Sequence, residues 1–141
     1  MAAVVTQTTS PVGAQVGPLL HAVSVVTAIP AAGDTDVMEL PTLGLKNIGV
    51  EALPTTNALD AFKVYAKFHP SSAWVLLYDA IDATPTESPL IIAASGTLAS
   101  LAAAATGWFI MDVRGIYRIK IAVSGSTDDT TGLTLRASGS R

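Results

Sequence analysis

Two histidines are the first residues in this chain that could do chemistry, as metal ligands or as general bases. His21 lies in an apolar stretch and His69 precedes Pro70. Neither has a second histidine or a cysteine at the spacing of a zinc site. A serine nucleophile would need a positioned base, and the Gly-x-Ser-x-Gly turn that presents such a serine does not occur. We therefore interpret both histidines as structural residues.

Two short acidic motifs could hold a hard cation through oxygen ligands. They are Asp34-Thr35-Asp36 and the pair Asp128-Asp129. Neither has the glycine and the distal glutamate that an EF-hand calcium loop places at fixed offsets. Aspartate and threonine are also ordinary turn formers, because their side chains bond to their own backbone. We favour turns at both places, and a cation at Asp128 and Asp129 stays open as the alternative.

Three further carboxylates, Asp79, Asp82 and Glu87, share one predicted loop. A glycosidase uses such a pair as general acid and base or nucleophile, but holds it across a cleft on rigid elements. Nothing in the surrounding sequence frames a cleft, so a solvated loop is the better interpretation. The sequence therefore predicts no catalytic residue, no cofactor-binding residue, no metal ligand and no cofactor.

Four aromatic residues could form a platform on which a sugar ring stacks. They are Trp74, Tyr78, Trp108 and Tyr117. Aromatic side chains of this kind are more often anchors in a core or at a subunit interface, because they bury a large apolar area. We favour the interpretation as anchors.

The stretch 107–139 is the part of the chain that would position such residues. From 117 to 123, apolar residues alternate with polar or small ones, which predicts a strand with one buried and one wet face. The flanking stretches 108–113 and 133–137 alternate in the same way, with a turn at Arg114-Gly115. Together they predict a three-stranded antiparallel meander.

A second clear alternation covers 61–69, and the chain then turns at 70–72 and returns as 73–78, which predicts a hairpin. In both alternating stretches one set of side chains should face the core. The residues expected to be buried are Phe62, Val64, Phe68, Tyr117, Ile119 and Ile121.

Shorter β-branched or apolar runs predict further strands. They lie at 19–29, 35–40, 44–50 and 89–94, and the stretches 51–60 and 79–88 are expected to be loops. The stretch 95–106 fits a short helix or a flat strand. Seven to nine short strands separated by turn residues predict an all-β sandwich or a closed barrel, with under about a tenth of the residues helical. The sandwich should comprise residues 19–141, and residues 1–18 should form an extended N-terminal arm with a short strand near 3–6.

The composition indicates a protein that is covered by partners. Apolar residues make up 50% of the 141 residues and charged residues 13%, against about 25% charged in an average soluble domain. A free monomer with so few charges would be poorly solvated, so we expect a homo-oligomer. The net charge is −3 and there is no basic cluster, so no nucleic-acid partner is expected.

One stretch, 88–111, has no charged residue and is long enough to cross a bilayer. Alanine, serine, threonine and glycine interrupt it, and its strongly apolar residues cluster only at its two ends. Two buried strands joined by an alanine-rich connector explain it better, so no membrane partner is expected. The N-terminus lacks the basic start and apolar core of a signal peptide.

Two segments together resemble known protein families. Residues 45–68 carry an Asn-x-Gly turn followed by Phe-x-Val, and residues 98–126 carry Gly-x-Tyr-x-Ile, as do the opening and closing strands of immunoglobulin-like adhesion and scaffold domains. The matching residues are Asn47, Gly49, Phe62, Val64, Gly115, Tyr117 and Ile119. The same order of segments is similar to small virion proteins of tailed bacteriophages. The resemblance implies an immunoglobulin-like or jelly-roll-like antiparallel β-sandwich, and it names no catalytic residue.

From this resemblance and the composition we expect a virion structural protein that is not an enzyme. The first expectation is a capsid decoration (cement) protein that oligomerises and binds the major capsid protein or other virion proteins. One alternative is a tail or fibre component. Another, from a different class, is an immunoglobulin-like module that binds a glycan or a host surface.

Overall fold

The computed structural model describes residues 3–11, 20–79, 81, 91–94, 101–127 and 130–140. These residues form ten strands and, at 101–103, one short 3₁₀ turn. The strands are β1 (Val4–Pro11), β2 (Leu20–Ile29), β3 (Thr35–Pro41), β4 (Asn47–Pro54), β5 (Leu59–Lys67), β6 (Val75–Asp79), β7 (Ile91–Ala94), β8 (Gly107–Asp112), β9 (Arg118–Gly125) and β10 (Thr131–Ser140). The predicted all-β class is therefore confirmed.

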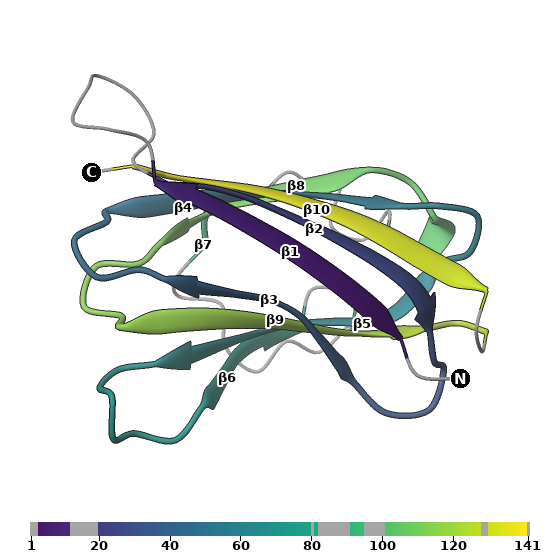
Figure 1. Cartoon of the computed structure of the whole chain (residues 1–141), viewed down its shortest axis with the longest axis horizontal. Coiled ribbons are helices and arrows are strands. Elements are labelled where there is room, and N and C mark those ends of the chain that lie inside the picture. Colours follow the sequence, from purple (N-terminus) through teal and green to yellow (C-terminus); the bar gives the residue numbers. More distant parts are fainter. Residues whose placement is uncertain are drawn as a thin grey trace.

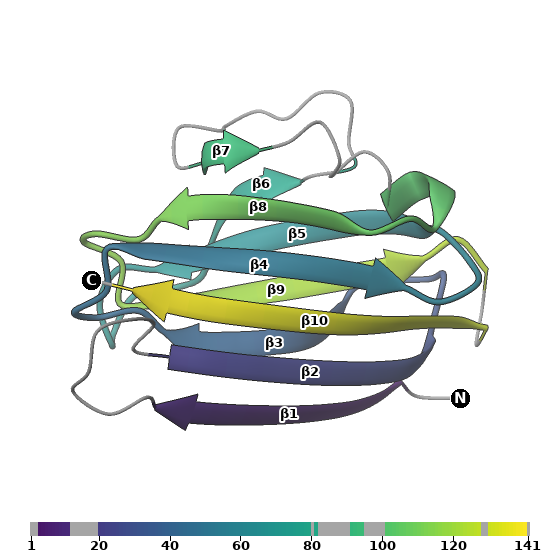
Figure 2. The same cartoon turned by 90° about the horizontal axis from the view of Figure 1, so that it is seen from above.

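The strands form two antiparallel sheets that face each other as the layers of a sandwich (Figure 1). One sheet has the order β1-β2-β10-β4-β8-β7, and Figure 2 shows these strands side by side. The other has the order β3-β9-β5-β6. Every second side chain of β4 and of the first eight residues of β2 is buried, as the period of two requires. The largest side chains in the core are Phe62, Phe109, Ile29, Leu40, Ile48, Leu59, Leu101, Met111, Ile116, Ile119, Ile121 and Leu133.

The strand pairing is that of one long hairpin wrapped around the core. At the middle of the chain β5 pairs with β6. Moving outward from that turn, β4 pairs with β8, β3 with β9, and β2 with β10. Successive pairs lie in alternate sheets, which is the jelly-roll arrangement. An immunoglobulin sandwich instead places strands A, B, E and D in one sheet and C, F and G in the other, and this chain does not follow that order.

The predicted three-stranded meander at the C-terminal end is wrong. All three strands form, but β8 and β10 belong to the six-stranded sheet and β9 to the four-stranded sheet. The turn at Arg114 and Gly115 carries the chain from one sheet to the other, and Gly115 adopts a φ of +84° that side chains disfavour. Alternation predicts which face of a strand is buried, but it does not specify the neighbouring strand.

The predicted loop 51–60 is largely strand. β4 continues to Pro54 and β5 begins at Leu59, so only a short connection remains. The buried positions at the end of β4 are Ala52 and Pro54, residue types that are depleted in strands. Buried and outward side chains do alternate to the end of β4, but the buried residues there are types that do not by themselves predict a strand.

Four of the six residues predicted to be buried are buried, namely Phe62, Val64, Ile119 and Ile121. Phe68 is 49% exposed, which contradicts the prediction. The reason is that β5 ends at Lys67, so the alternation of faces does not continue to residue 68. Tyr117, which precedes β9, is half-buried.

The first part of the predicted arm is a strand of the sandwich. Residues 4–11 form β1, which pairs with β2 along its whole length and lies at the edge of the six-stranded sheet. Residues 12–19 lie outside the described residues. The chain therefore uses its N-terminal segment to extend its own sheet.

Two polar side chains, Gln7 of β1 and Ser24 of β2, close one side of the sandwich, and we call them the edge clamp. The Gln7 side-chain amide accepts a hydrogen bond from the backbone N–H of Glu39 (3.0 Å) and donates one to its carbonyl oxygen (2.9 Å). The buried Ser24 hydroxyl donates to the carbonyl oxygen of Val37. Glu39 and Val37 lie in β3, at the edge of the four-stranded sheet. The clamp thus supplies hydrogen bonds that a neighbouring strand would otherwise supply.

The turn from β8 to β9 is held by an aspartate and an arginine two residues apart. The Asp112 carboxylate accepts hydrogen bonds from the Arg114 guanidinium (Nε to Oδ1, 3.0 Å) and from the Arg114 backbone N–H (3.0 Å). The guanidinium contact is the larger cause, and together the two lower the pKa of Asp112 from 3.8 to about 2.

We expect the variant Arg114→Ala to return the pKa of Asp112 toward 3.8, with the remaining backbone hydrogen bond keeping it somewhat lower. Because the folded-state pKa is depressed, the pair stabilises the turn above about pH 4, and this stabilisation is lost as the pH falls toward 2. An NMR titration of the Asp112 carboxyl measures both values. Arg136→Ala is the control, since Arg136 pairs with Glu51; a titration midpoint that does not move in Arg114→Ala would contradict the assignment.

Candidate functional site: an apolar outer face

The outward side of the six-stranded sheet, which we call the outer face, exposes apolar side chains on two separate strands. Val23 and Val25 of β2 and Trp108 and Ile110 of β8 point to solvent, and the exposed fractions of Val25 and Trp108 are 46% and 41%. Between them run β10 and β4. The outward residues of these two strands are Thr134, Arg136, Ser138, Gly49, Glu51 and Leu53. The face therefore has two apolar strips and, between them, a centre that is mainly polar apart from Leu53.

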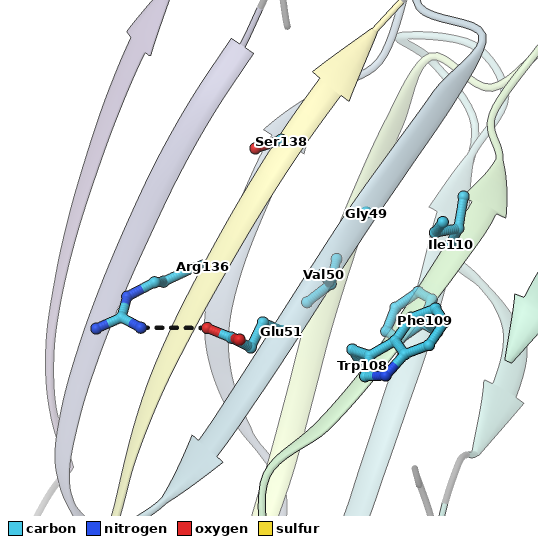
Figure 3. Close-up of a pocket in the computed structure, with 8 residues that line it drawn as sticks. All are labelled: Gly49, Val50, Glu51, Trp108, Phe109, Ile110, Arg136 and Ser138. Atoms are coloured by element: carbon cyan, nitrogen blue, oxygen red, sulfur yellow. Dashed lines mark hydrogen bonds and ion pairs between the residues drawn. The ribbon is translucent and has the colours of Figure 1, made fainter. Parts of the chain in front are cut away.

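A shallow hollow of about 330 Å³ lies on this face over β10, β4 and β8 (Figure 3). The strand register explains it. Ser138, Gly49 and Ile110 are cross-strand neighbours, and because Gly49 has no side chain the middle of that row is low. Phe109 also borders the hollow but is 1% exposed. It lies between Trp108 and Ile110 in β8, and its side chain points into the core while theirs point outward.

The next row of the hollow holds an ion pair and an indole. Arg136 Nη1 lies 3.1 Å from Glu51 Oε1, and Trp108 is the cross-strand neighbour of Glu51. Figure 3 shows the pair and the Trp108 ring on adjacent strands. An exposed ion pair contributes little to stability. The pair presents one charged donor and one charged acceptor beside a large, mainly apolar ring.

The structure separates the four aromatic residues that could form a sugar-binding platform and that we interpret instead as anchors. Trp108 lies at the hollow, whereas Trp74 lies over the four-stranded sheet. Tyr78 packs against the core, and Tyr117 is half-buried beside the start of β9. Because the two tryptophans lie on different sheets, the four residues do not form one platform.

The outward side of the four-stranded sheet carries a cluster that no sequence motif indicated. Lys120 Nζ lies 4.8 Å from the ring centroid of Trp74 and 5.1 Å from that of Tyr65. Lys67 Nζ lies 5.7 Å from the Trp74 ring, and Lys120 also lies 3.5 Å from Asp36. Cross-strand pairing of Tyr65 with Lys120 brings them together. In the alternating stretch 61–69, Lys63, Tyr65 and Lys67 occupy the side opposite the buried residues, and this pattern is the sequence signal that could have indicated the cluster.

The two histidines lie on different elements, His21 in β2 and His69 in the turn after β5, and they make different contacts. His21 is exposed on the outer face, with Nδ1 at 3.4 Å from the Ser138 hydroxyl. His69 Nδ1 accepts a hydrogen bond from the backbone N–H of Ser71 (3.1 Å) and so supports the turn after β5. Within the described part of the chain, no three His, Cys, Asp or Glu residues are grouped so that they could hold a metal ion.

The described acidic candidates are engaged by neighbouring groups. Asp34 lies 2.7 Å from Lys63 Nζ, and this contact, together with the charge of Asp34, raises the pKa of Lys63 above its ordinary value. Asp36 contacts Lys120, as described above. Asp79 accepts hydrogen bonds through Oδ1 from backbone N–H groups, including that of Ile81 (3.1 Å). The other candidates, Asp82, Glu87, Asp128 and Asp129, lie outside the described residues.

Comparison with known proteins adds little to this picture. No family model matches the chain. No curated protein sequence matches it either. Among solved structures, the crystal structure of the SPBc2 prophage-derived protein YomS is similar over 97% of this chain and 96% of that chain, with 12% sequence identity and a TM-score of 0.38. A likeness at this level carries no argument about function. Across the described residues, none of the helical structure has the length and hydropathy to cross a bilayer.

Proposed function

We propose that this chain is a non-catalytic virion structural protein, and first of all a capsid decoration protein that oligomerises and docks on the head of a tailed phage. The observation that carries the proposal is the apolar outer face, where Val23, Val25, Trp108 and Ile110 are exposed. On a chain with 13% charged residues, a partner that covers this face would remove its apolar side chains from water, which is favourable. The jelly-roll fold agrees with this role, because viral capsid domains use the same architecture.

The composition of the outer face suits a protein partner. The centres of protein interfaces are enriched in tryptophan and arginine and depleted in most other charged residues, and a few such side chains supply most of the binding energy. Trp108 and Arg136 both line the hollow, on either side of Glu51, and exposed aliphatic side chains lie on the same face. The partners we propose are the major capsid protein or other virion proteins, bound without turnover, with the chain located in the virion.

A tail or fibre component would use the same kind of face, so this alternative is separated from decoration only by position in the particle. A glycan-binding or host-surface module is favoured by one specific observation. The hollow places an exposed indole beside a carboxylate and a guanidinium, groups that can stack on and hydrogen-bond a sugar. This candidate predicts that sugars quench tryptophan fluorescence of the chain and that Trp108→Phe abolishes the quenching.

Immunogold electron microscopy tests the proposal. An antibody raised against the purified chain is applied to phage particles prepared from the source organism. Labelling of heads supports the decoration role, and labelling of tails or fibres supports the alternative position. Particles that carry no label, together with no band for the chain in their protein profile, would overturn the virion proposal.

A further inference from the structure

The two sheets have four edge strands, and β1 differs from the other three in lacking the features that prevent pairing with a further strand. β7 has four residues and β6 has five, and both pair with their neighbours through a register shift. β3 also has a shift in its pairing, and the edge clamp covers part of its backbone. Short length, bulges and cover are the devices by which natural sheets prevent edge-to-edge pairing. β1 has eight residues and pairs with β2 in one unbroken register, with no other strand beside it among those described.

The sequence of β1 lacks the charged residues that usually protect an exposed edge. The first 33 residues of the chain contain no Asp, Glu, Lys or Arg. Side chains 4–8 are exposed, including Val4 at 59%. A long, regular, uncharged edge is a template on which another strand can form hydrogen bonds. Among the four edge strands described, β1 is therefore the one best suited to pair with an added extended strand.

We propose that β1 pairs with β1 of a second copy, antiparallel and across a two-fold axis, so that the two six-stranded sheets become one continuous sheet. This inference rests on the self-association in the proposed function and names the surface that performs it. The occupant is a second copy because the pairing is self-complementary. An antiparallel pair of identical strands obeys two-fold symmetry, and an uncharged strand brings no like charges together.

The position of β1 in the sheet supports this geometry. Gln7 holds β1 against β3 through two hydrogen bonds, so the strand is fixed in place, and none of the described strands pairs with its other edge. A template that is already ordered loses less conformational freedom on binding. Thr6 and Thr8 are cross-strand neighbours of Val25 and Val23, so the dimer would bring the valine strips of two outer faces to the same side of the joined sheet.

The test uses the full chain and two matched variants. In a pairing centred on Gln7, Thr6 of one copy lies opposite Thr8 of the other, so Thr6→Lys/Thr8→Lys places like charges across the interface. Both side chains are exposed, and the fold of one copy should be kept. The control, Ala102→Lys/Ala105→Lys, adds the same charge at exposed positions outside the two sheets. Sedimentation equilibrium measures the dimer dissociation constant, and melting curves check that each variant folds.

We expect the β1 variant to raise the dimer dissociation constant at least about tenfold over the control, because like charges placed opposite each other oppose association. Equal dissociation constants for the β1 variant and the control would overturn the proposal. The same result is expected if two copies instead exchanged whole β1 strands, because residues 6 and 8 would then stay exposed and the added lysines would not oppose association. A wild-type chain that is monomeric at all concentrations would also overturn it. If the β1 variant fails to fold, amide hydrogen exchange of wild-type residues 4–10 decides: protection that rises with protein concentration supports the pairing, and constant protection overturns it.

The two proposals fail separately in these experiments. A monomeric chain that still labels phage heads removes the edge pairing and keeps the virion role. A β1-dependent dimer that labels no particle keeps the pairing and removes the virion role.

Discussion

Replacing Phe62 with alanine is expected to lower the free energy of unfolding by about 3–5 kcal/mol. Phe62 is completely buried in β5, and its ring meets that of Phe109 in β8 edge to face, with centroids 6.1 Å apart and planes at 81°. The two strands belong to opposite sheets, so this contact joins the layers of the sandwich. Truncation removes the contact and leaves a cavity that neighbouring strands can close only in part.

Chemical denaturation with urea measures this loss. The matched control is Phe68→Ala, which removes the same ring from a side chain that is 49% exposed at the end of β5. Substitutions at such surface sites usually change stability by about 0.5 kcal/mol or less. Similar losses in the two variants would mean that Phe62 and Phe68 are equally buried, and would contradict the register of β5.

Replacing Trp108 with alanine is expected to weaken binding of the chain to phage particles by about 30-fold, which corresponds to about 2 kcal/mol. The reason is that Trp108 is a large exposed indole in the apolar strip of the candidate face on β8, beside the Arg136–Glu51 ion pair. Co-sedimentation of the purified chain with particles that lack it gives the affinity. The fold should be unaffected, because the side chain points away from the core.

Trp74→Ala is the control for this prediction. It removes the other tryptophan of the chain, which lies over the four-stranded sheet against Lys67 and Lys120. We expect it to leave particle binding nearly unchanged. A larger loss in Trp74→Ala than in Trp108→Ala would move the docking surface to the opposite sheet and would refute the assignment of the outer face.

The strands could be predicted from the sequence where alternation is strong and its residues are typical of strands. The buried set Phe62, Val64, Ile119 and Ile121 follows from the period of two alone. The strand neighbours could not be predicted, because alternation says nothing about which edge meets which. The error at Phe68 has the same origin, since a pattern does not mark the residue at which hydrogen bonding stops.

The candidate face could be predicted only in part. Trp108 is conspicuous in the sequence, and an anchor role was an available interpretation. The ion pair beside it joins Arg136 to Glu51 across two strands that are far apart in the chain, and only the jelly-roll pairing of β10 with β4 makes them neighbours. The low point at Gly49 has no sequence signal at all, because it arises from the side chains that flank it on neighbouring strands.

The pairing of β2 with β10 has a consequence for how the protein is made. Ser138 lies opposite His21, which precedes it by 117 residues, so the pairing of β2 with β10 cannot form until the ribosome has released the chain through β10. Until then β2, which has no charged residue, can pair with β1 but its edge toward β10 stays unpaired in the nascent chain. Topologies with such distant pairings fold in about milliseconds to seconds, during which unpaired strands are prone to aggregate. The yield of soluble protein should therefore depend on chaperones and on the rate of synthesis more than on the stability of the finished sandwich.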